Sequence, residues 1–225
     1  ISLGLVGSEM CIRDRHFDYA RSGNPTRESG EAAIAQLEHG KHGYLFSTGM
    51  AAISSVLFTL SAGDHIVVSK HVYGGTFRLL ADILPRWGIT HDLVDFSDLD
   101  AVAAAITPAT KALYIETPSN PTLHITDIAA VVSLAQEHHL FTIADNTFLS
   151  PFLQKPLDLG VDIVVHSATK FLAGHSDILA GAVVVNRSDL ADKIYFIQNA
   201  VGATLGVLDT WLLLRGIKTL GVRMT

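Results

Sequence analysis

The sequence has a single cysteine, Cys11, among its 225 residues. One thiol can form neither an intrachain disulfide nor a cysteine-rich metal site, so both are excluded. Proteins without disulfides are typical of reducing compartments. We therefore expect the protein to be cytoplasmic.

Long hydrophobic runs and runs of one charge are also missing. The longest apolar stretch, residues 50–60, is interrupted by two serines and is too short to span a bilayer, so it predicts a buried helix. Apolar residues make up 48% of the chain and charged residues 17%, which is typical of a large folded core rather than disorder. The net charge is −6 and no basic stripe occurs, so we expect neither nucleic acid nor a membrane as a partner.

Sequence motifs for nucleotides and metals are absent as well. Neither a G-x-x-x-x-G-K-[ST] nor a G-x-G-x-x-G motif follows a predicted strand. The adjacent His138 and His139 lack the i, i+4 spacing of a metal-binding pair. His166 and His175 flank a lysine motif, and we interpret them as structural or supporting residues, with no metal expected.

The two ends of the chain differ from its middle. Residues 1–15 lack the charged and apolar regions of a signal peptide and resemble a translated sequencing adapter, so we expect a non-native leader. Residues 16–45 are predicted to form an N-terminal arm and helix, and residues 46–205 a large domain. Residues 206–225 are predicted to begin a helix that leads to a C-terminal domain absent from the chain. We expect both ends to be those of a fragment.

Apolar, β-branched segments alternate with amphipathic ones along the large domain. Strands are predicted at residues 44–46, 65–69, 90–94, 111–116, 141–144, 161–165 and 179–185. Helices are predicted at residues 27–39, 51–60, 74–84, 97–106, 127–138 and 207–220. Continuous apolar strands separated by helices predict an α/β fold with a mostly parallel sheet covered by helices on both faces.

Polar side chains follow several predicted strands at the point where each strand ends. They are residues 116–120 after one strand, Asp145 after another, and Ser167, Thr169 and Lys170 after a third. Ligands of parallel sheets bind at the carboxyl ends of the strands, so this convergence predicts an active site. Taken singly, Asp145 is equally consistent with a loop or capping aspartate, and Lys170 with a solvated surface lysine.

These residues suit one particular chemistry. The segment Ser47-Thr-Gly-Met50 opens a predicted buried helix, whose free N–H groups suit a phosphate, although a simple helix cap is the alternative. Asp145 suits a protonated ring nitrogen, and Ser167 and Thr169 suit a phosphate. Burial lowers the pKa of a lysine, so the neutral amine of Lys170 could form a Schiff base. Together these features predict a pyridoxal-phosphate site.

Seven motifs extend this interpretation and resemble the Cys/Met-metabolism family of pyridoxal-phosphate enzymes. They are Tyr19-Ala-Arg-Ser-Gly-Asn-Pro-Thr26, Ser47-Thr-Gly-Met-Ala51, Val72-Tyr-Gly-Gly-Thr76, Glu116-Thr-Pro-Ser-Asn-Pro121, Ala144-Asp-Asn-Thr-Phe148, His166-Ser-Ala-Thr-Lys170 and Gly174-His-Ser-Asp177. The resemblance covers about residues 16–225. It implies a type-I pyridoxal-phosphate-dependent transferase fold whose small C-terminal domain is truncated here. It also implies pyridoxal 5'-phosphate as the cofactor.

The resemblance implies a role for each matching residue. The catalytic residues would be Lys170, which forms the Schiff base, Asp145, which pairs with the pyridine nitrogen, and Tyr73, which stacks on the ring and assists proton transfer. Asn120 would lie near the ring hydroxyl. The phosphate would be held by Gly49, Met50, Ser167 and Thr169 of one subunit and by Tyr19 and Arg21 of its neighbour. A site shared in this way implies a homodimer, paired into a homotetramer.

The implied reaction is cleavage or formation of a C–S bond in transsulfuration, by a cystathionine γ-lyase, β-lyase or γ-synthase acting on cystathionine or an activated homoserine. Lyase or synthase activity, and β- or γ-specificity, stay open. The family's arginine for the substrate carboxylate lies beyond residue 225, so we expect the chain alone to bind cofactor without turning over substrate. Gly75 stands where methionine γ-lyases carry a cysteine, which disfavours that activity.

Two other classes of function are weighed against this one. The first is another type-I pyridoxal-phosphate enzyme, such as an aminotransferase or an O-acetylhomoserine sulfhydrylase. The second is a non-catalytic α/β domain that binds a phosphate or nucleotide, against which the missing nucleotide motifs argue.

Overall fold

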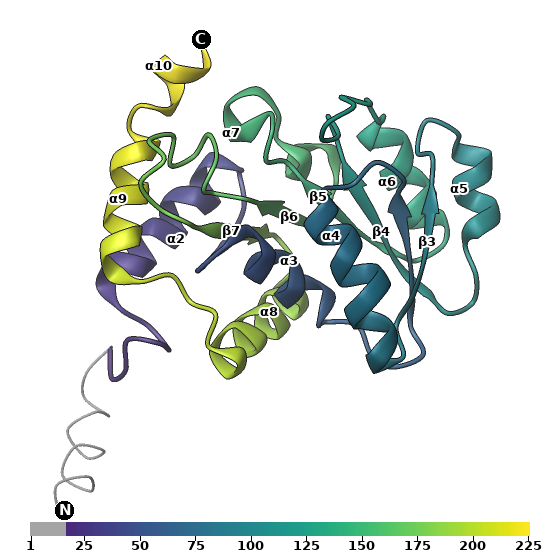
Figure 1. The fold of residues 1–225 in the computed structure, drawn as a ribbon, viewed down its shortest axis with the longest axis horizontal. Helices are drawn as coiled ribbons and strands as arrows, with labels where there is room; N and C mark the ends of the chain where they lie inside the picture. The colour runs from purple at the N-terminus through teal and green to yellow at the C-terminus, as the bar shows by residue number, and fades with distance from the viewer. Residues whose placement is uncertain (1–16) are drawn as a thin grey trace, which may run out of the picture.

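The computed structural model describes residues 17–225, and within them one mixed sheet of seven strands forms the centre (Figure 1). The predicted leader at residues 1–15, with Cys11, lies outside the described residues. The strand order is β1-β7-β6-β5-β4-β2-β3. The strands are β1 (His42–Phe46), β2 (His65–Ser69), β3 (Thr90–Val94), β4 (Thr110–Glu116), β5 (Phe141–Asp145), β6 (Ile163–His166) and β7 (Gly181–Val185).

The pairs β2–β3, β2–β4, β4–β5 and β5–β6 are parallel, whereas β7 pairs antiparallel with both β6 and β1. Strands β2, β4, β6 and β7 are buried along nearly their whole length, because helices cover both faces of the sheet. The predicted α/β fold with a mostly parallel sheet is therefore confirmed.

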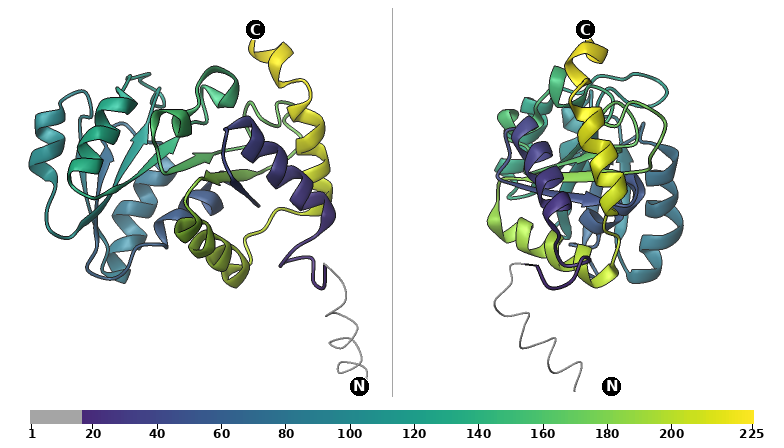
Figure 2. Two further views of the ribbon diagram at one scale, coloured as in Figure 1. Left: turned by 180° about the vertical axis from the view of Figure 1, so that it is seen from behind. Right: turned by 90° about the vertical axis from the view of Figure 1, so that its left-hand side faces the viewer.

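Helices from both ends of the chain and from its middle cover one face of the sheet (Figure 2). They are α2 (Pro25–Leu37), α5 (Leu99–Ala105), α6 (Ile128–Glu137) and α9 (Val207–Ile217). Each contributes apolar side chains to a core that includes alternate residues of the strands, such as Ala144 and Val164.

The opposite face is covered by α3 (Gly49–Leu57), by α8 (Ser188–Val201) and by the turns that follow α4 (Gly74–Arg78). The intervening strand residues, among them Ile143 and Val165, point to this second core. Helix α3 lies very close to the sheet, because a Cβ on Gly181 would approach the Thr48 carbonyl oxygen to 2.1 Å. The glycine thus lets the start of α3 reach the end of the sheet where the pocket lies.

Several element boundaries differ from the sequence predictions. The predicted helix at residues 74–84 is split, since α4 passes into a π-helical turn, Leu79–Ile83, and a 3-10 turn, Leu84–Trp87, that runs through Pro85. The helix predicted over residues 97–106 is α5, which begins after Asp98, whose carboxylate accepts from the Ala101 N–H.

The helix predicted over residues 207–220 is α9, which ends at Ile217, and a separate helix, α10 (Leu220–Met224), follows it. Helix α8 was not predicted at all. The short α7 (Ser150–Leu153) and the 3-10 turn Pro156–Leu159 were not predicted either.

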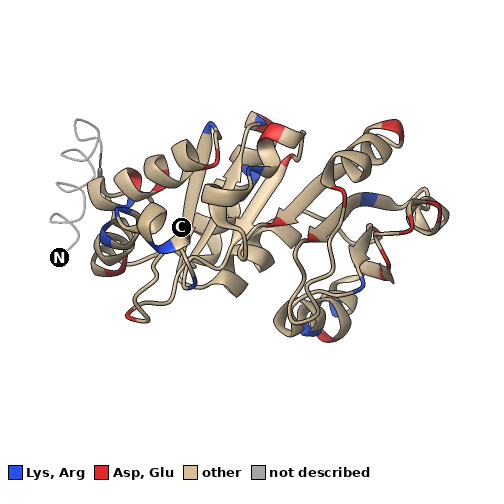
Figure 3. Cartoon of the chain, turned by 90° about the horizontal axis from the view of Figure 1, so that it is seen from above, with Lys and Arg blue, Asp and Glu red and all other residues tan. Residues whose placement is uncertain are grey.

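Charged side chains of both signs are scattered over helices and loops (Figure 3). Within residues 17–225, no helix is both long and apolar enough to cross a membrane.

Candidate active site

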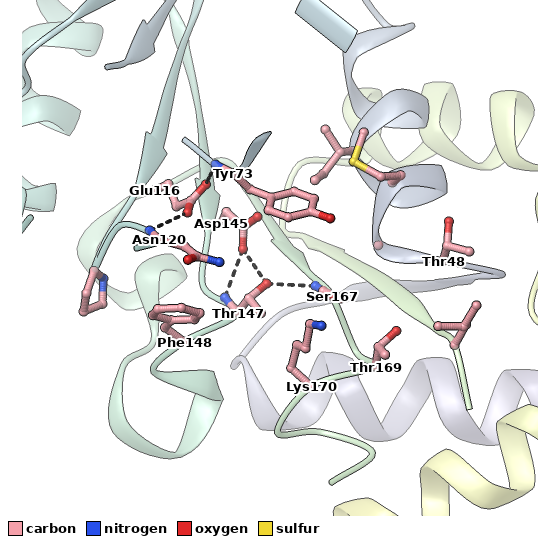
Figure 4. Close-up of a pocket in the computed structure, with 15 residues that line it drawn as sticks. Thr48, Tyr73, Glu116, Asn120, Asp145, Thr147, Phe148, Ser167, Thr169 and Lys170 are labelled. Carbon is pink, nitrogen blue, oxygen red and sulfur yellow. Dashed lines mark hydrogen bonds between the residues drawn. The ribbon is translucent and has the colours of Figure 1, made fainter. Parts of the chain in front are cut away.

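A pocket of about 240 Å³ opens where β4, β5 and β6 end and α3 begins (Figure 4). Eight of the ten predicted cofactor-binding residues line it. They are Gly49, Met50, Tyr73, Asn120, Asp145, Ser167, Thr169 and Lys170. Tyr19 and Arg21 are not among the residues that line it.

The first turn of α3 forms one end of the pocket. Thr48 is the N-cap, and its hydroxyl accepts from the Ala51 N–H at 3.0 Å. The N–H groups of Gly49 and Met50 precede the first intrahelical bond, so the helix offers them to an anion in the pocket. A Cβ on Gly49 would lie 2.9 Å from Ser167 Cβ. The absence of a side chain at Gly49 therefore lets the start of α3 approach Ser167, the other predicted phosphate contact.

Asp145 is buried at the end of β5 and points into the pocket (Figure 4). Its Oδ1 accepts from the Thr147 N–H at 3.0 Å and from the Thr147 hydroxyl at 2.5 Å. Burial raises the pKa of Asp145, while these hydrogen bonds and the nearby His166 oppose the rise. A cationic ring nitrogen would compensate the buried carboxylate.

Thr147 was not predicted to matter. Its hydroxyl also accepts from the Ser167 N–H at 2.8 Å, so it joins the end of β5 to the segment that follows β6. The turn in which an aspartate accepts from the N–H two residues later is typical of Asp and Asn, and this was the available signal.

Glu116 is the second carboxylate in the pocket, and its role was also missed. It lies in register with Asp145 on the neighbouring parallel strand. Its Oε2 accepts from the Tyr73 N–H at 2.7 Å and its Oε1 from the Asn120 N–H at 3.0 Å. Burial, and then the charge of Asp145, raise the pKa of Glu116 to about 8. Glu116 thus fixes the backbone of the two loops that carry Tyr73 and Asn120.

Lys170 lines the pocket, and its amine points into it (Figure 4). The expected burial of Lys170 is not found, since its side chain is exposed in this chain. The Thr169 hydroxyl donates to the Ala180 carbonyl at 3.1 Å and accepts from the Ala180 N–H at 2.9 Å. To bind a phosphate, this hydroxyl would have to leave the Ala180 carbonyl.

Tyr19 and Arg21 lie elsewhere on the chain. The Arg21 guanidinium carbon is 5.2 Å from the centre of the Tyr19 ring, and both side chains are exposed. The segment that carries them is joined to α8, because the Ser22 hydroxyl donates to Asn199 and the Tyr195 hydroxyl donates to the Ser22 carbonyl.

The two histidines beside the lysine motif contact protein groups. His166 Nε2 donates to Glu38 Oε1 at 2.6 Å in a fully buried pair. His175 Nδ1 donates to the Ala173 carbonyl at 2.6 Å. Among residues 17–225, no group of three or more His, Cys, Asp or Glu side chains could hold a metal ion.

The arrangement fits pyridoxal phosphate on three counts. The start of α3 offers free N–H groups to a phosphate, and a protonated ring nitrogen would stabilise the buried carboxylate of Asp145. The Lys170 amine lies in the same pocket, where it can reach the aldehyde. A mostly parallel α/β sheet with these three features in a pocket at its carboxyl edge fits the class of pyridoxal-phosphate-dependent proteins.

Comparison with known proteins identifies the family. The family described as Cys/Met metabolism PLP-dependent enzyme matches residues 7–225, so the chain belongs to it, and pyridoxal 5'-phosphate is its cofactor. The expected resemblance is confirmed.

Relatives of this chain include several bacterial enzymes. It is 58% identical over 208 residues to the cystathionine beta-lyase MetC of Bacillus subtilis (strain 168), which covers 92% of this chain and 53% of the relative. It is 50% identical to a cystathionine gamma-lyase of the same strain, over 92% of this chain and 55% of the relative. A crystal structure of cystathionine gamma-lyase from Lactobacillus plantarum, complexed with L-serine, superposes with a TM-score of 0.91 at 57% identity, over 92% of this chain and 55% of that chain. The chain thus spans about half the length of the relatives it matches.

Proposed function

We propose that the protein is a pyridoxal-phosphate-dependent enzyme of transsulfuration that breaks or forms a C–S bond of a cystathionine-type amino acid. The observation that carries the proposal is the pocket itself, in which Lys170, Asp145 and the start of α3 face one small volume. The names of the relatives, which include β-lyases, a γ-lyase and γ-synthases, support this substrate class.

A bound pyridoxal phosphate supplies an aldehyde that takes up amino groups and a ring that accepts electrons. Lys170 Nζ is the amine that would hold this aldehyde, and once free it would move protons. Asp145 keeps a proton on the ring nitrogen by its negative charge. Tyr73 would stack on the ring and assist proton transfer, and Asn120 would lie near the ring hydroxyl.

The phosphate contacts come from a second group of residues. Gly49 and Met50 would donate their backbone N–H groups and Ser167 its hydroxyl, and the Thr169 hydroxyl would join them on leaving the Ala180 carbonyl. All residues that line the pocket fall between Thr48 and Leu179, which supports residues 46–205 as the cofactor-binding region.

Borohydride reduction followed by peptide mapping tests the covalent step on full-length protein. We expect a pyridoxyl adduct on Lys170 and none in a Lys170→Ala control. A folded wild-type protein that binds pyridoxal phosphate but carries its adduct on another lysine, or carries none, would contradict the proposal.

Product analysis with cystathionine decides between the two lyase reactions. Both reactions consume one water: a β-lyase yields homocysteine, pyruvate and ammonia, whereas a γ-lyase yields cysteine, 2-oxobutyrate and ammonia. A second candidate is γ-replacement on an activated homoserine, supported by a relative, 50% identical, that is named cystathionine gamma-synthase/O-acetylhomoserine (thiol)-lyase. Assays with sulfide or cysteine as the second substrate detect that activity.

We further propose that two copies of the chain complete each active site, in a homodimer that pairs into a homotetramer. Tyr19 and Arg21 are exposed and absent from their own chain's pocket, which suits contact with the phosphate in a neighbouring copy. Helices α8 and α9 carry exposed apolar side chains that a second copy could cover, among them Phe196, Leu208 and Trp211. Native mass spectrometry measures the assembly.

We also propose a cytoplasmic location, which the scarcity of cysteine supports, and cell fractionation tests it.

A further inference from the structure

Glu38 is an acidic residue that lies buried on the face of the sheet opposite the pocket. It caps the C-terminal end of α2, and its side chain is 0% exposed. Its Oε1 accepts from His166 Nε2 at 2.6 Å and from Asn146 Nδ2 at 2.9 Å. A buried carboxylate is costly unless it is paired, so this arrangement is a specific one.

The two partners of Glu38 are sequence neighbours of pocket residues. Asn146 follows Asp145, and His166 precedes Ser167. Successive residues of an extended segment point to opposite faces of a sheet. Asp145 and Ser167 therefore face the pocket, while Asn146 and His166 face α2, as their contacts with Glu38 require.

The network continues to a third strand. Gln154 Nε2 donates to Asn146 Oδ1 at 3.0 Å and to the Thr117 carbonyl at 3.3 Å. Asn146 Nδ2 also donates to the Gln154 carbonyl at 2.8 Å. Because Thr117 follows Glu116, the network reaches the ends of β4, β5 and β6. These strand ends carry Glu116, Asp145 and Ser167, which line the pocket.

We propose that Glu38 is a positioning residue for the cofactor site: through His166 and Asn146 it sets the spacing of Ser167 and Asp145 from behind the sheet. The inference rests on the proposed function, since it takes the pocket to be the pyridoxal-phosphate site. Glu38 touches neither cofactor nor substrate. Glu38 acts by fixing the distance between Asp145, which would pair with the ring nitrogen, and Ser167, which would bind the phosphate.

The second oxygen of Glu38 allows a sharp design. Oε2 has no hydrogen-bond partner among the described residues, so a glutamine keeps the accepting oxygen and places its amide where no bond is lost. Glu38→Gln is thus the conservative variant, and Glu38→Leu removes both contacts at similar size. Thr110→Val is the matched control, because Thr110 is buried at the other end of the same sheet and bonds His65 at 2.8 Å.

The experiment measures the dissociation constant of pyridoxal phosphate from full-length protein by equilibrium dialysis, together with the urea midpoint of unfolding. We expect Glu38→Leu to raise the dissociation constant at least tenfold and Glu38→Gln to keep it within threefold of the wild-type value. We expect Thr110→Val to leave the dissociation constant unchanged, even if its urea midpoint falls as much as that of Glu38→Leu. A Glu38→Leu protein that binds like Thr110→Val overturns the inference, and so does a Glu38→Gln protein that binds no better than Glu38→Leu.

Gln154→Leu decides the matter if Glu38→Leu does not fold, since Gln154 lies at the outer end of the network. We expect a rise of at least threefold in the dissociation constant, and binding equal to wild type overturns the inference. Failure of the proposed function is distinguishable, because wild-type protein would then bind no pyridoxal phosphate at all.

Discussion

The backbone N–H of Tyr73 donates to Glu116 Oε2 at 2.7 Å, which joins the loop after β2 to the end of β4. The other oxygen of the same carboxylate accepts from the Asn120 N–H. The positions of an aromatic wall and an amide wall of the pocket therefore depend on one acidic side chain, which is itself buried beside Asp145.

The protonation of Glu116 makes stability depend on pH in a defined direction. Burial raises its pKa from 4.5 to about 8, so between these values the folded protein binds a proton that the unfolded chain releases. The free energy of unfolding of the cofactor-free protein then falls as pH rises from about 4.5 to 8, with a slope of up to about 1.4 kcal/mol per pH unit.

Glu116→Gln tests this dependence, because a glutamine does not titrate. We expect a flatter profile in urea unfolding between pH 5 and 9, together with a loss of roughly 1–3 kcal/mol at low pH from one unpaired N–H group. Equal slopes for variant and wild type would show that Glu116 does not titrate in this window.

Asp145→Asn separates the charge of Asp145 from its shape. An asparagine keeps an acceptor for Thr147 but removes the negative charge, so we expect activity to fall by at least about 100-fold, the range for loss of one preorganised electrostatic contact. The pyridoxyl adduct on Lys170 should still form. Asp158→Asn, an exposed aspartate, is the control, and activity within threefold of wild type in Asp145→Asn would contradict the assignment.

Gly49→Ala tests the anion site at the start of α3. The added Cβ would lie 2.9 Å from Ser167 Cβ and 3.0 Å from its Cα, so the helix must move away from the phosphate wall. We expect the dissociation constant of pyridoxal phosphate to rise by roughly tenfold or more. Gly221→Ala, whose Cβ would have ordinary contact at 3.5 Å, should bind as wild type does.

Gly75 places a steric limit on the aromatic wall. A Cβ there would come within 2.5 Å of Tyr73 Cε1 and 2.7 Å of Met50 Sδ, so Gly75→Cys must displace the Tyr73 ring. We expect a change in the visible spectrum of the holoenzyme and a fall in kcat of about tenfold or more. The neighbouring Gly74→Ala, which meets nothing closer than 3.9 Å, should leave the spectrum unchanged.

A shared site predicts complementation between inactive subunits. We expect Lys170→Ala and Arg21→Ala proteins to lose activity separately but to regain it when refolded together, because one site of each heterodimer then has both residues intact. Mixing Lys170→Ala with Asp145→Asn should restore nothing, since both residues line the pocket of one chain. Equal recovery in the two mixtures would argue against sharing of the site.

The parts of the site that follow apolar strands were predictable from the sequence. Asp145 is the last residue of β5 and Lys170 follows β6, and a parallel sheet brings strand ends together. Glu116 was within a predicted polar segment, but its two N–H partners depend on how far the loops after β2 and β4 fold back, which local sequence does not specify. Glu38 looks like an ordinary charged residue at a helix end, and only the tertiary contact with β5 and β6 buries it.

The missed helix α8 has a similar explanation. Its buried residues Leu190, Ile194 and Gln198 follow one another at four-residue intervals, which is a readable helical pattern. Large apolar side chains on the opposite face, such as Phe196, blur that pattern because they are exposed in this chain. The sequence does not show which of the two faces packs on the sheet.

The alternation at the end of β5 constrains how this protein can vary. Asp145 serves the pocket and Asn146 serves the buried network beneath it, although they are adjacent in sequence. Deletion or insertion of a single residue in β5 would exchange the two faces, turning the carboxylate toward α2 and the amide toward the ligand. The strand can thus tolerate changes of side chain, but a change of its length by one would abolish both assemblies at once.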